Sequence, residues 1–257
     1  MQSLLHSHDQ VISYGEVFHL LALQRNNLDV LYDVVNNPTE YIKKRIYRPY
    51  PDTTRAVGYK MVYQEIGSDN VFLREMNTKD VSVTIKERRE AFSRFMRNNF
   101  DLETLRQRFS DYLDDLESDR SVKVIHLKRV NKLKSLCSKK MALKSGVWSS
   151  RKDESPLEPI HLNYLECLNY FQDTDGLEKK YDSLFRNHQT VEITFEELLS
   201  DLDSVQEKLQ NFLGLTYDEL SSPLKKLNKC TLRETISNYS ALKDKFENSP
   251  WIKYFED

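Results

Sequence analysis

The segment from Val122 to Trp148 constrains the fold more than any other part of the chain. It opens on a short apolar run rich in β-branched residues, which is typical of a strand buried on both faces of a parallel sheet. Arg129 follows at the expected strand end, and apolar residues then recur at helical spacing until Gly146, a helix stop. A strand end, a basic turn and a helix start together offer an arginine, hydroxyls and unpaired amides to an anion. The segment therefore predicts a site for a phosphorylated nucleotide.

The rest of the chain alternates between strand-like and helix-like patterns. Short apolar runs predict strands at Val11–Tyr14, Ala56–Tyr63, Val122–Leu127 and Val191–Phe195. Amphipathic patterns predict helices at Lys86–Asn98, Asp101–Glu117, Asn163–Arg186 and Ser204–Leu213. For the last helix we expect Asp203 and Gln206 to form a capping pair and Gly214 to end it. This alternation predicts an α/β fold, a single domain over residues 1–257 with a mostly parallel central sheet flanked by helices.

Composition narrows the class of protein. With 39% hydrophobic and 30% charged residues, the chain is typical of a globular protein, and its formal net charge of −2 argues against a general nucleic-acid binder. The scattered cysteines suit neither a disulfide framework nor a zinc motif, which favours reduced thiols and a cytoplasmic location; they are Cys137, Cys167 and Cys230. We find no signal peptide and no apolar run long enough to cross a bilayer.

Five segments, in order along the chain, resemble sulfotransferases that use 3′-phosphoadenosine 5′-phosphosulfate (PAPS), and within that family the bacterial and carbohydrate-type branch. They are LLHSHDQVISYGEVF (Leu4–Phe18), AVGYKMVY (Ala56–Tyr63), VIHLKRVNKLKSLCSKKMALKSGVW (Val124–Trp148), VEITFEELLSD (Val191–Asp201) with NFLGL (Asn211–Leu215), and LRETISNYSALK (Leu232–Lys243). The resemblance implies a P-loop-NTPase-like sulfotransferase architecture. It also implies transfer of a sulfuryl group from PAPS to an acceptor hydroxyl, on a carbohydrate or glycolipid, without a metal.

The resemblance implies roles for individual residues. In the family, an arginine at the strand-to-helix turn and a serine eight or nine residues later hold the 3′-phosphate, and Arg129 and Ser138 match that pattern. Val130 departs from it, because many relatives carry a second arginine or another polar residue there. Glu16 resembles the acidic residue that several relatives place near the acceptor hydroxyl, where a carboxylate can take the proton. The alternative for Glu16 is a glutamate at a helix N-terminus.

Further contacts are expected from three other parts of the sequence. The segment Asn228–Tyr239 resembles the stretch that folds over the nucleotide in the family. Its candidate anion contacts, for which a solvated basic face is the alternative, are Lys226, Lys229 and Arg233. Lys60 is a candidate cation near the acceptor or the leaving group, or else an exposed lysine of an edge strand. Trp148 resembles the family's aromatic residue after the helix, or else is a packing anchor.

One element of the family is not found in this sequence. The phosphosulfate-binding loop, roughly Arg/Lys-Ser-Gly-Thr/Ser-Thr, follows the family's first strand, and Met1–Leu5 aligns with the helix just after it. We expect either that the chain starts within a longer protein, or that it is a natural short form that holds the sulfuryl group weakly. As written, the chain exposes an edge of its sheet where a central strand belongs, so we expect low stability and weak or absent turnover.

Other functions remain open at this point. The main alternative is a non-catalytic module of the same fold that binds adenosine bisphosphate or a protein partner. A metallohydrolase built on His6-Ser7-His8-Asp9 lacks further ligands at a suitable spacing. A nucleotide kinase would need a Gly-x-x-x-x-Gly-Lys-Ser/Thr motif, which this sequence does not contain.

Overall fold

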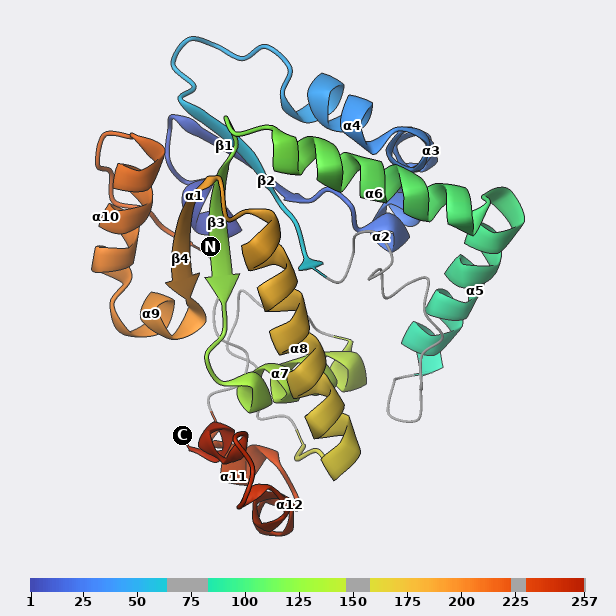
Figure 1. The fold of residues 1–257 in the computed structure, drawn as a ribbon, viewed down its shortest axis with the longest axis vertical. Coiled ribbons are helices and arrows are strands. Elements are labelled where there is room, and N and C mark those ends of the chain that lie inside the picture. The colour runs from blue at the N-terminus through green and yellow to red at the C-terminus, as the bar shows by residue number, and fades with distance from the viewer. Residues whose placement is uncertain (64–82, 147–157, 223–229, 257) are drawn as a thin grey trace.

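The computed structural model describes residues 1–63, 83–146, 158–222 and 230–256, which form strands and helices in alternation (Figure 1). The strands are β1 (Val11–Glu16), β2 (Ala56–Lys60), β3 (Lys123–Lys128) and β4 (Gln189–Thr194). The α-helices are α1 (Gln2–Leu5), α2 (Leu20–Asn26), α3 (Leu28–Asn36), α4 (Pro38–Tyr41), α5 (Val83–Asn99), α6 (Leu102–Ser118), α7 (Lys132–Ser145), α8 (Tyr164–Leu184), α9 (Phe195–Ser200), α10 (Leu202–Leu213), α11 (Leu232–Thr235) and α12 (Tyr239–Phe246). The described residues also form a π-helix, η1 (Ile42–Ile46), and a 3₁₀-helix, η4 (Ile252–Phe255). Within the described ranges, the helices are too short or too polar to cross a lipid bilayer.

The strands form two parallel pairs. β1 pairs with β2 from Val11 opposite Ala56 onward, and β3 pairs with β4 from Lys123 opposite Gln189 onward. In Figure 1 the arrows of β3 and β4 point down, and the arrow of β2 slants downward across the view. Among the described residues no strand joins the two pairs. The predicted α/β class with parallel pairing is therefore confirmed, but the expected central sheet is present as two separate pairs.

A cavity of ≈ 1220 Å³ separates the two pairs. Its walls include every residue of β2 and residues 122–127, whereas none of the residues described in β4 lines it. The unpaired edges of β2 and β3 therefore face each other across the cavity. This placement corrects one prediction, because β3 is not buried on both faces. His126 is its one buried residue, and Leu127 is 39% exposed.

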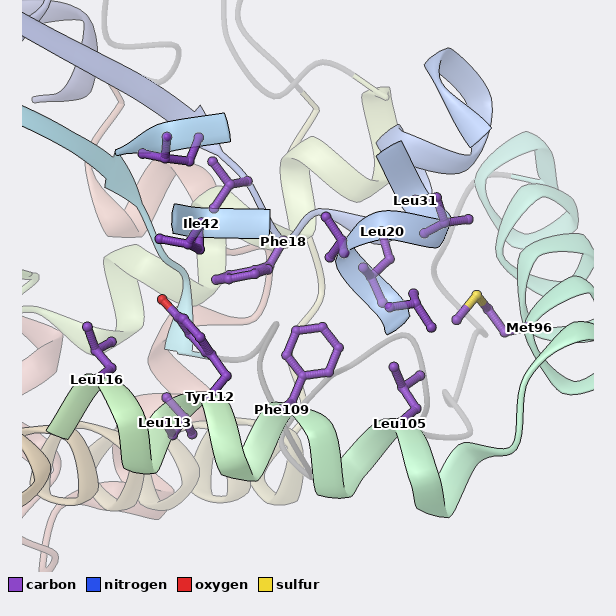
Figure 2. Close-up of a cluster of buried hydrophobic side chains, with 14 of the residues drawn as sticks. Phe18, Leu20, Leu31, Ile42, Met96, Leu105, Phe109, Tyr112, Leu113 and Leu116 are labelled. Atoms are coloured by element: carbon purple, nitrogen blue, oxygen red, sulfur yellow. The ribbon is translucent and has the colours of Figure 1, made fainter. Parts of the chain in front are cut away.

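A hydrophobic cluster packs α6 against the amino-terminal helices (Figure 2). Phe18 is 1% exposed, and its ring meets the rings of Phe109 and Tyr112 at centroid distances of 5.6 and 5.0 Å. Asp101 caps α6 by accepting a hydrogen bond from the Thr104 amide at 3.1 Å. The amphipathic helix predicted at Asp101–Glu117 is confirmed, and the residues that it buries on one face are Leu105, Phe109, Tyr112, Leu113 and Leu116.

Capping residues fix the ends of α7 and α10. Gly146 and Gly214 end these helices in the left-handed conformation, with φ of 78° and 74°, as their positions in the sequence predict. The predicted capping pair of α10 is wrong. Asp201, rather than Asp203, accepts a hydrogen bond from the Ser204 amide at 3.2 Å, so the helix starts earlier than expected.

Two strands end earlier than predicted. β2 ends at Lys60 instead of Tyr63, and β4 ends at Thr194 instead of Phe195. At Thr194 the hydroxyl accepts a hydrogen bond from the Glu197 amide at 3.1 Å, and the Glu197 carboxylate accepts one from the Thr194 amide at 2.6 Å. This capping box turns the chain from β4 directly into α9.

Candidate functional site

Arg129 and Ser138 lie together at the start of α7. Arg129 follows directly on β3, and Ser138 lies about two turns into the helix. Nη1 of Arg129 donates a hydrogen bond to the Ser138 hydroxyl at 3.1 Å, and the hydroxyl donates to the Lys134 carbonyl at 3.0 Å. The structure thus brings together the two residues that were expected to share a phosphate. Their role as phosphate ligands stays a prediction.

The guanidinium of Arg129 lies between an aromatic ring and a carboxylate. Its Cζ lies 4.7 Å from the centre of the Phe195 ring, and its Nε lies 3.9 Å from Oε1 of Glu196. That separation is too long for a hydrogen bond, and within the ranges that the structure describes, Nε is buried without a hydrogen-bond partner. Burial lowers the pKa of Arg129, and the Glu196 charge opposes this effect. A buried donor without an acceptor favours an added anion at this position.

A carboxylate accepts hydrogen bonds from the backbone amides at the amino end of α7. Glu196 on α9 accepts hydrogen bonds from the backbone amides of Val130 at 3.0 Å and Asn131 at 3.3 Å. Asn131 caps α7 by accepting a hydrogen bond from the Lys134 amide at 3.0 Å, and its side chain donates to the Tyr254 carbonyl at 3.1 Å. The turn after β3 is therefore tied to both α9 and η4. Its amides hold negative charge, as amides at a helix start commonly do.

Sequence reasoning missed Phe195 and Glu196. Both follow β4 directly, and the register pairs Lys128 of β3 with Thr194 of β4. The signal that could have found them is the position of the two residues directly after a predicted strand. If that strand is the parallel neighbour of β3, both strands end at the same edge of the sheet. Val130, which departs from the family pattern, exposes its side chain and contributes its backbone amide to this site.

Glu16 forms an ion pair with Lys60 at the carboxyl ends of β1 and β2. The strand register shifts between Tyr14 and Glu16, so Gly15 bulges out and Glu16 lies opposite Lys60. The alternative in which Glu16 begins a helix is wrong, because Glu16 is the last residue of β1. Within the described part of the chain, no hydrogen bond or ion pair joins this pair to Arg129.

Arg233 lies on α11, where it packs on an aromatic ring. Its Cζ lies 5.1 Å from the centre of the Tyr239 ring, and the Tyr239 hydroxyl donates a hydrogen bond to the Phe255 carbonyl. Since Asn131 binds the neighbouring Tyr254 carbonyl, Arg233 is connected to the α7 turn through η4. The other expected contacts lie outside the described residues; they are Trp148, Lys226 and Lys229.

The histidines near the amino terminus serve the fold. Nδ1 of His8 accepts a hydrogen bond from the Gln10 amide at 3.0 Å, and its Nε2 lies 3.0 Å from the Thr216 carbonyl. Nδ1 of His6 accepts a hydrogen bond from the Ser13 amide at 3.4 Å. In the ranges that the structure describes, no three His, Cys, Asp or Glu side chains gather as a metal site would require. The metallohydrolase alternative therefore has no geometric support among these residues.

Comparison with known proteins gives a distant similarity over part of the chain. The chain is 28% identical over 149 residues to Nodulation protein H of Rhizobium meliloti, which is 56% of this chain and 60% of that protein. The Nodulation protein H of Rhizobium meliloti strain 1021 matches to the same extent. The match thus spans about 60% of the length of these relatives. No family model matches the chain, and no solved structure matches it significantly.

Proposed function

We propose that this chain is a sulfotransferase that transfers a sulfuryl group from PAPS to an acceptor hydroxyl, on a carbohydrate or glycolipid. The distant similarity to Nodulation protein H agrees with a sulfotransferase. The observation that carries the proposal is the contact between Arg129 and Ser138 at 3.1 Å, with the Arg129 Nε buried and without a hydrogen-bond partner among the described residues. This pair suits a phosphate, because a guanidinium fork and a hydroxyl can converge on its oxygens.

Arg129 and Ser138 would hold the 3′-phosphate of the donor. In the described part of the chain the Nε–H of the guanidinium has no acceptor, and Phe195 packs against the guanidinium from one side. The partly buried position strengthens each contact to an anion relative to water. Arg233 and Lys229 are proposed as further contacts to the nucleotide from the segment Asn228–Tyr239.

Glu16 would accept the proton of the acceptor hydroxyl. In this reaction the acceptor oxygen bonds to sulfur, the bond from sulfur to the bridging oxygen breaks, and the hydroxyl proton leaves. PAPS supplies the activated sulfuryl group when it is bound. Lys60 orients the Glu16 carboxylate through their ion pair. Both residues lie at the carboxyl ends of their strands, where parallel α/β sheets commonly bind ligands.

Isothermal titration with adenosine 3′,5′-bisphosphate tests the donor site. We expect binding by the chain, and a loss of about 30- to 160-fold in affinity for Arg129→Ala, because charge-assisted hydrogen bonds contribute about 2–3 kcal/mol. Adenosine 5′-monophosphate should bind equally to both proteins, since it lacks the 3′-phosphate. Arg186→Ala, at an exposed arginine beyond α8, is the matched control. Equal affinity of Arg129→Ala and the unaltered chain for the bisphosphate would refute the site.

The second candidate function is a non-catalytic module that binds adenosine bisphosphate, because the two strand pairs are separated by a cavity. It predicts binding of the bisphosphate without transfer of sulfate from PAPS. Transfer of radiolabelled sulfate to a panel of glycans and glycolipids distinguishes the two functions. In the enzyme, Glu16→Gln should lower turnover by about 10²–10⁴-fold and leave bisphosphate affinity unchanged.

A further inference from the structure

Tyr63 and His126 form a hydrogen-bonded pair in the wall of the cavity between β2 and β3. The Tyr63 hydroxyl lies 2.7 Å from Nδ1 of His126, and the His126 side chain is only 6% exposed. Both residues line the cavity. The ring of Tyr63 stacks on the ring of Tyr181 with their centres 4.4 Å apart, which fixes the position of the phenol. The pair is therefore a rigid polar feature of the cavity wall.

The hydrogen bond determines which nitrogen of His126 carries the proton. Burial and the nearby carboxylates raise the pKa of the Tyr63 hydroxyl, so it keeps its proton and acts as the donor. Burial lowers the pKa of His126, so its imidazole is neutral at pH 7. A neutral imidazole that accepts a hydrogen bond at Nδ1 carries its own proton on Nε2. His126 is therefore a hydrogen-bond donor at Nε2.

A lysine limits the pull of the neighbouring carboxylates on a second proton. Oδ1 of Asp182 lies 3.8 Å from Nδ1 of His126. Nζ of Lys128 lies 2.7 Å from Oδ2 of Asp182 and 2.6 Å from Oε2 of Glu192. Since Lys128 compensates both carboxylates, their attraction is smaller than the cost of burying an imidazolium. The surroundings thus keep the ring neutral.

The Nε2 atom of His126 is available to a ligand. Within the described ranges it has no hydrogen-bond partner, and it is not among the fully buried atoms that lack one. Solvent therefore reaches Nε2 although the ring is almost buried, and the cavity is the space that this residue lines. A fixed donor in a largely buried position suits an oxygen on which negative charge develops, because it needs no reorganisation during the reaction.

His126 connects the two parts of the proposed active site. It lies three residues before Arg129, or about 10 Å along an extended chain. Through Tyr63 it is joined to the segment that follows Lys60, the partner of Glu16. In the proposed reaction, the bridging oxygen of PAPS lies between the nucleotide and the sulfuryl group, and it gains negative charge as its bond to sulfur breaks.

We propose that His126 is a further catalytic residue, a neutral imidazole that donates a hydrogen bond from Nε2 to the bridging oxygen of PAPS. Tyr63 is its positioning residue. The electron pair of the sulfur–oxygen bond moves to the bridging oxygen, which leaves as part of the 5′-phosphate of adenosine 3′,5′-bisphosphate, and His126 keeps its proton. This role rests on the proposed sulfotransferase function.

Nitrogen-15 NMR of the histidine-labelled chain tests the tautomer without a nucleotide. At pH 7.5 we expect the His126 signals of a neutral ring with a proton on Nε2 and none on Nδ1, assigned by their loss in His126→Asn. Tyr63→Phe should shift the Nδ1 signal, because the hydrogen bond is lost. Tyr59→Phe is the matched control, since this cavity-lining hydroxyl bonds to Tyr112 instead. A proton on Nδ1 of the unaltered chain would overturn the proposal.

Two nucleotides identify the ligand of Nε2 by the same NMR signals. Adenosine 3′,5′-bisphosphate should shift the Nε2–H signal, whereas adenosine 3′-monophosphate, which lacks the 5′-phosphate, should bind and leave it in place. A bisphosphate that binds without shifting this signal would refute the role of His126 and leave the proposed function intact. No binding of either nucleotide by the folded chain would refute the donor site, and the role of His126 with it.

Transfer of sulfate from PAPS gives a second readout. His126→Asn keeps an acceptor for Tyr63 but places no nitrogen at the position of Nε2. We expect kcat to fall by about 10²–10³-fold, with bisphosphate affinity unchanged within twofold. Tyr63→Phe should lower kcat by a smaller factor, and Tyr59→Phe should leave it unchanged. An unaltered kcat in a His126→Asn protein that binds the bisphosphate would overturn the proposal.

Discussion

Oε2 of Glu196 accepts a hydrogen bond from the Val130 amide at 3.0 Å, which ties α9 to the turn between β3 and α7. The same carboxylate lies 3.9 Å from Nε of Arg129. A fixed negative charge therefore lies against the guanidinium that we propose as the phosphate ligand. It compensates the buried positive charge when no anion is bound, and it competes with phosphate when one arrives.

We expect Glu196→Gln to tighten the binding of adenosine 3′,5′-bisphosphate and to weaken the fold. The amide keeps an acceptor oxygen for the turn but removes repulsion of about 1 kcal/mol toward phosphate, or roughly fivefold in affinity. The weaker hydrogen bonds should lower the free energy of unfolding by about 1 kcal/mol. Isothermal titration and urea unfolding measure the two effects.

Glu197→Gln is the control for this substitution. Glu197 lies next to Glu196 but closes the capping box with Thr194, and a glutamine there keeps a neutral, weaker form of that hydrogen bond, so Glu197→Gln should lower stability slightly without changing bisphosphate affinity. A Glu196→Gln protein that binds as weakly as Arg129→Ala would contradict the prediction. That outcome would mean that the carboxylate orients Arg129 for the phosphate.

The contact between Arg129 and Ser138 could be predicted because it is local in sequence. One strand end and the helix that follows it fix the separation of the two side chains, and the apolar spacing in the sequence identifies both elements. Phe195 and Glu196 could not be predicted in this way. Their place beside Arg129 depends on β4 being the neighbour of β3, and strand order is a tertiary property that one sequence does not state.

Element types were easier to predict than their ends and their burial. Asp201 and Asp203 are both suitable helix caps, and the choice between them depends on the backbone at Asp201, which lies outside the helical region with φ −148°. The exposure of β3 depends on the segment across its edge, because an apolar run is buried on both faces only if neighbours cover it. The apolar residues of this segment therefore predicted more burial of β3 than the structure shows.

We expect the stability of the fold to fall as the pH drops below about 6.5, in part through His126. Burial lowers the pKa of His126 in the folded state below its ordinary value of 6.5, although Asp182 and Glu192 oppose the effect. The unfolded chain then binds a proton first, so stability is complete above 6.5 and is lost as the pH falls through the folded-state value. Urea unfolding at pH 7.5, 6.5 and 5.5 measures the slope.

His126→Asn is the variant that isolates this contribution. Nδ1 of His126 lies 2.7 Å from the Tyr63 hydroxyl, and an asparagine oxygen can accept the same hydrogen bond without titrating. The slope between pH 6.5 and 5.5 should decrease but not vanish, because burial also lowers the pKa of His19. An unchanged slope in His126→Asn would show that the histidine does not contribute.

Two glycine-to-alanine substitutions should change stability in opposite directions. Gly214 has φ of 74° at the end of α10, so Gly214→Ala should lower the free energy of unfolding by about 1–2 kcal/mol. Gly176 lies inside α8, and apart from its chain neighbours and the nearby helix backbone, an added Cβ there would meet no described atom within 4 Å. Gly176→Ala should therefore raise the free energy of unfolding by about 0.5–1 kcal/mol. Thermal unfolding of the two variants beside the unaltered chain tests both signs, and a shift in the same direction would contradict the assignment.

For the ion pair between Lys132 and Glu178, removal of one partner should destabilise the fold more than replacement of both partners. The two side chains are 6% and 18% exposed, and the pair joins the start of α7 to α8. Glu178→Ala should lower the free energy of unfolding by about 3–5 kcal/mol, because it leaves the Lys132 charge buried without its partner.

Lys132→Met combined with Glu178→Leu should restore most of that loss, since apolar side chains of similar volume avoid the cost of removing both charges from water. Urea unfolding of Lys132→Met alone, of Glu178→Leu alone and of the double variant completes the cycle, with Glu178→Ala measured beside them. If the double variant is as unstable as Glu178→Ala, the attraction between the two charges, and not the cost of an unpaired one, is what stabilises this contact.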